Sequence, residues 1–452
     1  MKRQMIAFFA LVLLALVAKP VAAQTQFILQ PTPNGSAAGI ASLYGLTLIG
    51  PVGNGSQGIY LVSAPTGVNV QNEIADVDKD SDVSDFELDE PTAIAESPAS
   101  LNQSSVAILD NYPNPQSVPY FGTQVLGLYA TQPAVATIHL SDAQSAYSYT
   151  GAGVVVAIID TGVDPNHAGL QRVLVPGYDF VNNIAGSGSE LVDLTQTDQT
   201  VLSNSSSNPA TKGQQAKVNQ SSVAILDQST LSQLNTQTLP AAFGHGTMVA
   251  GVIHLMAPGA KIMPLKAFRG DGTANLSAIL DAIYYAADHG ANIINMSFSL
   301  LTSSNQLSAA LAYAANKGVV LVASTGNTGT SSVANPAAMD NVMGVASSTN
   351  DDGRSAFSSY GEGTFVAAPG EQVITFYPGN NYAVASGTSF SAPMVSGTAA
   401  LALQAFSSGG SEGANHAISN AEVLPSALGL GNGELNVLQA IQAALNNSEG
   451  DD

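Results

Sequence analysis

Apolar runs of strand length alternate with alanine-rich stretches of helix length between about residue 125 and about residue 445. The apolar runs are Val154–Ile159, Ile293–Met296, Val319–Ala323 and Val342–Val345, and the helical stretches are Leu276–His289 and Gln306–Lys317. Continuous apolar runs are typical of strands buried on both faces, as in parallel sheets that are covered by helices. The alternation therefore predicts an α/β fold with an open, largely parallel sheet.

The first 23 residues have a different pattern. Lys2 and Arg3 precede the apolar run Met5–Val17, and small residues follow at 21–23. This order is typical of a signal peptide, and the run is shorter than the roughly 20 residues needed to span a bilayer. We therefore expect residues 1–23 to direct export to the medium or the periplasm, with no membrane anchor.

Residues 24–92 are predicted to form a small α+β domain. Its expected strands are Phe27–Gln30, Gly45–Ile49, Gly58–Ser63 and Val83–Leu88. Residues 93–124 are rich in Pro, Asn, Gln and Ser, a composition typical of a linker. Residues 446–452 form an acidic tail.

Residues 181–239 interrupt the α/β pattern with a polar stretch of low complexity, which we interpret as an inserted surface excursion. The nine residues Asn102–Asp110 (NQSSVAILD) recur unchanged at Asn219–Asp227. Two copies are too few for a solenoid. We interpret them as duplicated hairpin strands at the surface, with docking of the linker against the insertion as the alternative.

Composition excludes several classes of function. With 33 acidic and 12 basic residues the formal charge is −21, which disfavours nucleic acids and anionic membranes as partners. The chain has no cysteine, which excludes disulfides, thiol catalysis and cysteine metal sites. Apolar residues make up 45%, enough for a large core, and we expect a monomer.

Three residues lie where this fold places reactive groups. Asp160 ends the first apolar run, at the carboxyl edge of the sheet. His245 lies among small residues before a helix-like run, and Ser389 precedes another, whose amino end favours an anionic oxygen. Each has a simpler interpretation: Asp160 and Ser389 can be caps, and His245 can be structural or a metal ligand. Asp160 also lies in a DTG motif, but aspartic proteases need two such loops and this chain has one.

The three residues together are a stronger signal than each alone. A serine hydroxyl is a poor nucleophile until a histidine accepts its proton, and that histidine needs an acid to orient it. Asn327 follows the run Val319–Ala323, where its amide can donate to an oxyanion. The four residues predict acyl transfer at Ser389.

Four segments resemble the signature blocks of subtilisin-like serine peptidases. They are VVVAIIDTGVD (154–164), GHGTMVAGVI (244–253), ASTGNTG (323–329) and SGTSFSAPMVSGTAAL (386–401). The resemblance extends over residues 125–445 and implies a mixed, largely parallel seven-stranded sheet with helices on both faces. It implies a secreted serine endopeptidase acting on proteins or peptides, with Asp160, His245 and Ser389 as the triad and Asn327 as the oxyanion donor.

The resemblance has further implications. YGLTLIG, GIYLVSAP and VSDFELDEP, within residues 24–92, resemble the family's inhibitory propeptide, which is removed on maturation. Substrate would bind along Ser297, Phe298 and Ser299, with Gly326 beside them. The family has a glycine in this edge segment, and a serine there has less conformational freedom.

Many members of the family bind calcium through an Asp shortly after the catalytic Asp and through a loop that interrupts the histidine helix. Here Gly169 takes the position of that Asp, and residues 251–262 run on without the loop. We therefore expect no calcium at the usual family site and no other cofactor. Asp76, Asp78, Asp80 and Glu87 have EF-hand-like spacing, but Ser81 replaces the required glycine, which favours a solvated acidic face.

Two alternatives belong to other functional classes. One is a catalytically silent binding protein with the same fold, which loss of a triad residue would favour. The other is an exported scaffold protein whose function resides in the repeat-bearing insertion.

Overall fold

The computed structural model describes residues 24–94, 116–196, 199, 217–220, 223–225, 239–300 and 302–448. The predicted signal peptide, most of the linker, the first copy of the repeat and the last four residues of the tail lie outside them. Contacts divide the chain into two compact units, the first formed by residues up to 50 with 60–88, and the second by 51–59 with 89 onward. No helix in the described ranges is long and apolar enough to cross a membrane.

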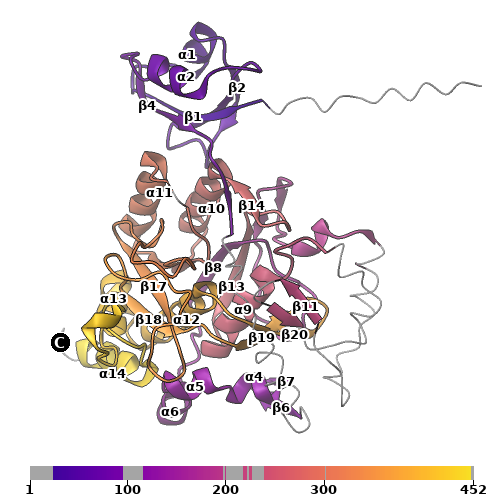
Figure 1. Cartoon of the computed structure of the whole chain (residues 1–452), viewed down its shortest axis with the longest axis vertical. Coiled ribbons are helices and arrows are strands. Elements are labelled where there is room, and N and C mark those ends of the chain that lie inside the picture. The colour runs from indigo at the N-terminus through magenta and orange to yellow at the C-terminus, as the bar shows by residue number, and fades with distance from the viewer. Residues whose placement is uncertain are drawn as a thin grey trace, which may run out of the picture. The chain divides into compact units, whose positions relative to one another are not determined.

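The first unit is a four-stranded sheet with two helices (Figure 1). Its elements are β1 (Gln26–Pro31), α1 (Ala37–Leu43), β2 (Thr47–Pro51), β3 (Tyr60–Ser63), α2 (Val70–Val77) and β4 (Val83–Leu88), with strand order β2-β3-β1-β4. β1 pairs antiparallel with β3 and β4. The rings of Phe27 and Phe86 stack at 4.8 Å in its core. Asp76 lies within α2 and pairs with Lys79 at 3.2 Å, so the acidic run is a helix end rather than a loop.

The second unit is built on an eight-stranded sheet with the order β10-β9-β13-β8-β15-β16-β17-β18. The strands are β8 (Val155–Asp160), β9 (Tyr178–Asp179), β10 (Ile184–Ala185), β13 (Lys261–Lys266), β15 (Ile293–Met296), β16 (Val320–Ser324), β17 (Val342–Ser348) and β18 (Val366–Pro369). The seven from β9 to β18 are parallel, which confirms the predicted fold. β10 adds an antiparallel edge from within the segment that we interpreted as a surface excursion.

Helices cover both faces of this sheet. α9 (His245–Met256) packs on α12 (Thr388–Ala405), and α10 (Leu276–Asp288) packs on α11 (Asn305–Asn316). Val156 and Ile158 of β8 share one apolar core with α9 and α12. The alternating residues Ala157 and Ile159 are buried too but lie outside that core, so each face of β8 is covered.

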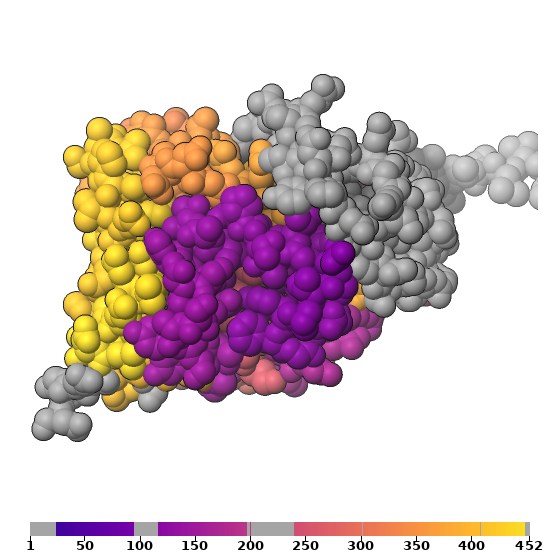
Figure 2. All heavy atoms as spheres, turned by 90° about the horizontal axis from the view of Figure 1, so that it is seen from below, coloured from indigo at the N-terminus to yellow at the C-terminus, as the bar shows by residue number. Residues whose placement is uncertain are grey.

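The remaining helices surround the sheet. They are α4 (Gly127–Thr131), α5 (Pro133–Thr137), α6 (Leu140–Ala146), α13 (Gly410–Ser419) and α14 (Val437–Ser448), with 3₁₀ turns η2 (Ser407–Gly409) and η3 (Ser426–Leu428). Figure 2 shows the segment with α4–α6 beside the C-terminal residues, and the Val437 N–H donates to the Ile138 carbonyl at 2.9 Å. α14 extends to Ser448, into the predicted acidic tail.

The second copy of the repeat contributes to a smaller sheet. This sheet has the order β11-β12-β20-β19, formed by β11 (Lys217–Gln220), β12 (Val223–Ile225), β19 (Val373–Tyr377) and β20 (Asn381–Ala385). β11 and β12 pair as antiparallel strands, and Val223 lies opposite Ala385 of β20. The VAI of this copy is therefore a paired strand beside β20.

Candidate active site

β8 ends at Asp160 and α9 begins at His245, and the fold brings these two residues into hydrogen-bond contact. The Nδ1 atom of His245 lies 2.8 Å from Oδ1 and 2.9 Å from Oδ2 of Asp160. Asp160 is 1% exposed and His245 is 0% exposed. A carboxylate placed at Nδ1 orients the ring and favours the tautomer that leaves Nε2 as the basic nitrogen.

Ser389 is the second residue of α12, at the positive end of the helix dipole. Its hydroxyl donates to the Ser297 carbonyl at 3.3 Å, and the Ser297 hydroxyl donates to the Ser389 carbonyl at 3.0 Å. The next residue, Phe390, packs beside the imidazole of His245 with a centroid separation of 5.8 Å. Ser389 and His245 therefore belong to one site, although they are far apart in the sequence.

Asn327 lies in the loop after β16 and is held by the residue before Ser389. Its Oδ1 atom accepts hydrogen bonds from the backbone N–H and the hydroxyl of Thr388, both at 2.9 Å. Since only the oxygen of an amide accepts, these bonds fix the oxygen on the Thr388 side and turn the NH₂ group away from it. The amide donor is thus oriented before any substrate binds.

The predicted substrate-binding residues lie together, but their side chains do not all face the same way. A side-chain carbon built on Gly326, whose φ is +103°, would lie 3.4 Å from the Ser299 hydroxyl. The Phe298 side chain is 2% exposed and packs on Phe268 with a centroid separation of 5.0 Å. Phe298 can therefore contact a substrate only through its backbone.

A short strand that precedes the linker lies at the same edge. β5 (Pro91–Ala93) pairs antiparallel with β14 (Thr273–Asn275). The Thr92 hydroxyl donates to the Ser299 carbonyl at 3.4 Å. β5 therefore lies against the segment predicted to bind substrate.

Residues on both sides of β5 extend this contact, namely Ile94 directly after the strand and Asp89 two residues before it. The Ile94 N–H donates to the Gly272 carbonyl at 2.8 Å. The Asp89 carboxylate accepts from the Ser277 N–H at 2.7 Å and from its hydroxyl at 3.0 Å. Asp89 thereby satisfies a backbone donor in the first turn of α10, which would otherwise lack an intrahelical partner.

Glu190, the first residue of the 3₁₀ turn η1 (Glu190–Asp193), was not predicted from the sequence. Its side chain is 0% exposed, and Oε1 accepts a short hydrogen bond from the Thr247 hydroxyl. Oε2 accepts from the Gly244 N–H at 2.8 Å and from the Thr161 hydroxyl at 3.3 Å. Burial raises the pKa of Glu190 to about 8. Glu190 lies in a polar segment without periodicity, so no local pattern could have identified it.

A buried lysine lies beside Glu190 and was also missed. The Lys266 ammonium is 0% exposed and donates to Asp193 Oδ2 at 2.5 Å. It also donates to the carbonyls of Thr161 at 2.9 Å and Phe268 at 2.8 Å. η1 thus places two carboxyls next to the catalytic strands, so this part of the predicted insertion belongs to the core of the site.

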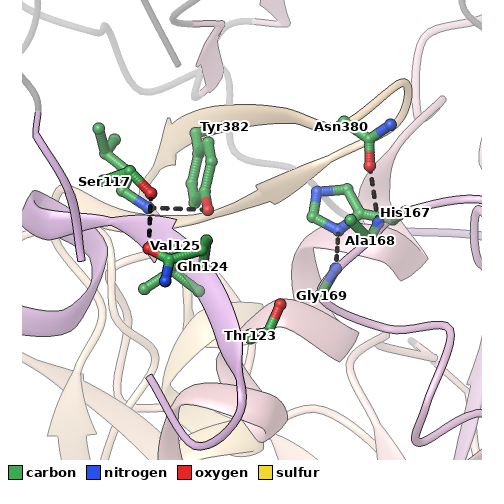
Figure 3. A pocket seen from close by; sticks show the side chains of 10 residues that line it. Ser117, Thr123, Gln124, Val125, His167, Ala168, Gly169, Asn380 and Tyr382 are labelled. Carbon is green, nitrogen blue, oxygen red and sulfur yellow. Dashed lines mark hydrogen bonds between the residues drawn. The ribbon is translucent and has the colours of Figure 1, made fainter. Parts of the chain in front are cut away.

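The position of the family's calcium-binding Asp is tightly packed. A side-chain carbon on Gly169 would lie 2.5 Å from the ring of Phe376, so a carboxylate does not fit there without rearrangement. α9 runs uninterrupted to Met256. Figure 3 shows the adjoining pocket of about 180 Å³, where His167 and Gly169 face the hairpin that carries Thr123. Among the residues that the structure describes, no cluster of His, Asp and Glu could hold a metal ion. The absence of cofactors stays a prediction.

The hairpin at this pocket is formed by β6 (Ser117–Tyr120) and β7 (Thr123–Leu126). The Tyr382 hydroxyl accepts from the Leu126 N–H at 2.9 Å, and Asn380 Oδ1 accepts from the Ala168 N–H at 2.6 Å. Neutral polar groups therefore line the pocket.

Comparison with known proteins agrees with this geometry. The sequence model of the Subtilase family matches residues 151–446. The chain is 35% identical over 259 residues to the thermophilic serine proteinase of Bacillus sp. (strain AK1), covering 55% of this chain and 52% of that protein. It is 34% identical over 251 residues to thermitase of Thermoactinomyces vulgaris, covering 56% and 75%. It is 37% identical over 170 residues to subtilisin BL of Lederbergia lenta, covering 36% and 63%. The chain thus spans about half of the first of these relatives, and it belongs to the subtilase family.

Proposed function

We propose that this protein is a secreted serine endopeptidase that hydrolyses peptide bonds through an acyl-enzyme at Ser389. The observation that carries the proposal is the buried hydrogen bond between His245 and Asp160. Phe390, the residue after Ser389, packs against the same imidazole. Membership of the subtilase family supports it, since the matched relatives are named proteinases. The intact catalytic set argues against a silent binding protein.

The proposed acylation uses His245 as general base. The Ser389 hydroxyl attacks the scissile carbonyl while Nε2 of His245 takes its proton, and Asp160 orients and stabilises the imidazolium. The C–N bond then breaks, and the imidazolium returns the proton to the leaving amine. In the second half, water attacks the ester and gives a proton to His245. The bond between the acyl carbon and Ser389 Oγ then breaks, and the imidazolium returns its proton to Oγ, which releases the acid and restores the hydroxyl.

Asn327 and the Ser389 N–H are the proposed oxyanion donors. The Ser389 N–H belongs to the first turn of α12, where backbone donors lack helical partners. The Asn327 amide is held by Thr388 with its NH₂ group turned away from those bonds. Donors fixed in advance need no reorganisation when negative charge develops on the carbonyl oxygen.

Substrate is proposed to bind as an added strand along Ser297–Ser299, with β14 on its other side and Gly326 close by. β-Strand addition uses backbone hydrogen bonds for affinity and side-chain pockets for selectivity. The pairing of β5 with β14 and the contact of the Thr92 hydroxyl with the Ser299 carbonyl support this proposal.

Residues 24–92 are proposed to be an inhibitory propeptide. The segment that leads out of them, β5, occupies the edge at which we expect substrate, and Asp89 caps α10 beside it. Such a segment blocks substrates until the chain is cut after Ile94, within the predicted linker. We expect a monomer without cofactor, membrane or nucleic-acid partner, exported to the medium or the periplasm.

The reaction is tested with a fluorophosphonate probe on the purified protein, with Ser389→Ala as the matched control. We expect the wild type to be labelled and to cleave casein, and the variant to do neither. Equal labelling of both proteins, or of neither, would contradict the peptidase proposal.

Maturation is tested by sequencing the N-terminus of the secreted active protein and of the Ser389→Ala variant. We expect the active protein to begin between residues 95 and 124, and the variant to retain residues 24–92. An active protein that begins at Gln24 would show that residues 24–92 are not a removable inhibitor.

A further inference from the structure

We propose that Glu190 is a positioning residue of the active site, which holds the segments that carry Asp160 and His245 in the register that their hydrogen bond requires. This inference rests on the proposed function of these two residues. It adds to the site a carboxyl that does not touch the substrate and acts through the residues next to the catalytic pair.

The carboxyl of Glu190 joins two segments that are 85 residues apart in the sequence. On one side it accepts from Thr161, the residue after Asp160. On the other it accepts from Gly244 N–H, the residue before His245, and from the hydroxyl of Thr247. Each oxygen of one rigid carboxyl is thus committed, so the two segments cannot move independently.

Backbone packing supports the same conclusion. A side-chain carbon on Gly246 would lie 1.9 Å from the Gly162 carbonyl oxygen, and one on Gly162 would lie 2.7 Å from the Glu190 nitrogen. The Thr161 hydroxyl also accepts from the Gly246 N–H at 3.0 Å. The loop after β8, the start of α9 and the start of η1 therefore meet backbone to backbone, with the Glu190 carboxyl at their junction.

Burial, more than the charges around it, favours the neutral form of Glu190. The groups that face it are Asp164, which raises its pKa, and Lys266, which lowers it, while its hydrogen bonds from Thr247 and Gly244 also lower the pKa. Burial outweighs these, so the acid is protonated below about pH 8. A protonated carboxyl donates through one oxygen, so in the neutral acid one of the two contacts with the hydroxyls of Thr161 and Thr247 is donated by Glu190. The neutral acid thus joins the two segments without placing another negative charge beside Asp160.

Glu434 provides a matched control. It is 1% exposed, its pKa is also raised to about 8 by burial, and it accepts from the Ser348 hydroxyl at 2.8 Å. Its backbone exchanges two hydrogen bonds with Glu422, both at 2.8 Å. None of these partners adjoins Asp160, His245 or Ser389 in the sequence or by a described hydrogen bond. Loss of its carboxyl should therefore affect folding without affecting catalysis.

The experiment compares Glu190→Leu, Glu190→Gln and Glu434→Leu in the full chain, measuring kcat and KM on a peptide substrate, the pH profile and the melting temperature. We expect Glu190→Leu to lower kcat about 100-fold with KM within about 2-fold, because small displacements of catalytic groups reduce the rate by this order. Glu190→Gln, which retains an acceptor and a donor like the protonated acid, should recover about 10-fold of that loss below pH 8. Glu434→Leu should melt earlier with kcat within about 2-fold of wild type.

The outcomes separate this inference from the proposed function. An inactive, unlabelled wild type overturns both. An active wild type with a folded Glu190→Leu that keeps its kcat within about 2-fold overturns only the role of Glu190, as does a Glu434→Leu that loses as much kcat as Glu190→Leu. If Glu190→Leu does not fold, Glu190→Gln decides: a lowered kcat with a changed alkaline limb of the pH profile supports the inference, and a wild-type kcat and profile overturn it.

Discussion

Glu190 and Glu434 are chemically alike and differ in what they hold. Both are buried carboxyls whose pKa burial raises to about 8. Glu190 forms hydrogen bonds with residues next to Asp160 and His245, whereas Glu434 forms one with Ser348, the last residue of β17. The difference teaches that a carboxyl with a raised pKa indicates a functional role only when its hydrogen-bond partners lie on segments that carry reactive groups.

The largest expected effect concerns Asp193, which lies in the same 3₁₀ turn η1 as Glu190. Asp193→Ala leaves the Lys266 ammonium buried with two carbonyls as its remaining partners. Removal of one member of a buried pair leaves an uncompensated charge, so we expect a loss of about 3–5 kcal/mol in the free energy of unfolding by urea titration. The control is Asp288→Ala, which breaks the partly exposed pair with Lys317. A loss at Asp193 no greater than that of the control would contradict burial as the cause.

The second prediction concerns the pH dependence of stability. The folded pKa of Glu434 is raised from 4.5 to about 8, so the native state keeps a proton that the unfolded chain releases. Its stabilising contribution is fully present below pH 4.5 and is lost as the pH rises through 8. In urea titrations of the wild type, the free energy of unfolding should therefore fall between pH 5 and pH 8. In Glu434→Gln this fall should be smaller by on the order of a few kcal/mol. An unchanged slope in the variant would show that the carboxyl does not titrate in this range.

The smallest expected effects come from removing one hydroxyl that contacts Glu190 and one that contacts Glu434. Thr247→Val removes a donor to Glu190 and Ser348→Ala removes a donor to Glu434. Ser348→Ala should lower the free energy of unfolding by about 1–2 kcal/mol, because one buried hydrogen bond is lost. Thr247→Val should lower it further, because the Thr247 hydroxyl also accepts from the Asp164 N–H at 2.7 Å. Only Thr247→Val should also lower kcat, by about 10-fold, in assays on the same peptide. Equal kcat values in the two variants would remove the distinction between the two carboxyls.

The sheet could be predicted because its strands are buried on both faces. The predicted run Ile293–Met296 matches β15, and Val154–Ile159 matches β8 to within one residue. The short strands β9 and β10 lie in polar sequence, where pairing with the sheet edge and not local pattern decides the structure. For the same reason, the boundary of the predicted insertion was misjudged at η1.

The proposed catalytic residues could be picked out from the sequence because each lies in a short block of small residues that allows close approach. Glu190 could not, because its partners are contributed by three distant segments and its own neighbours are polar. Phe298 was predicted from the family resemblance to bind substrate, but it lies beyond the end of β15 and its side chain is buried against Phe268. The segment could be predicted from the sequence, whereas the direction of the Phe298 side chain required the structure.

α9 has a mechanical consequence for the active site. The Tyr129 hydroxyl donates to the Gly251 carbonyl at 2.7 Å, and the Tyr120 hydroxyl donates to the Leu255 carbonyl, so aromatic residues from outside the sheet fix its far half. A helix of 12 residues is about 18 Å long, so a tilt of only about 3° at one end displaces the other by about 1 Å. His245 lies at the near end of α9, so Tyr129 and Tyr120 help to set the position of this proposed general base from the other end of the helix.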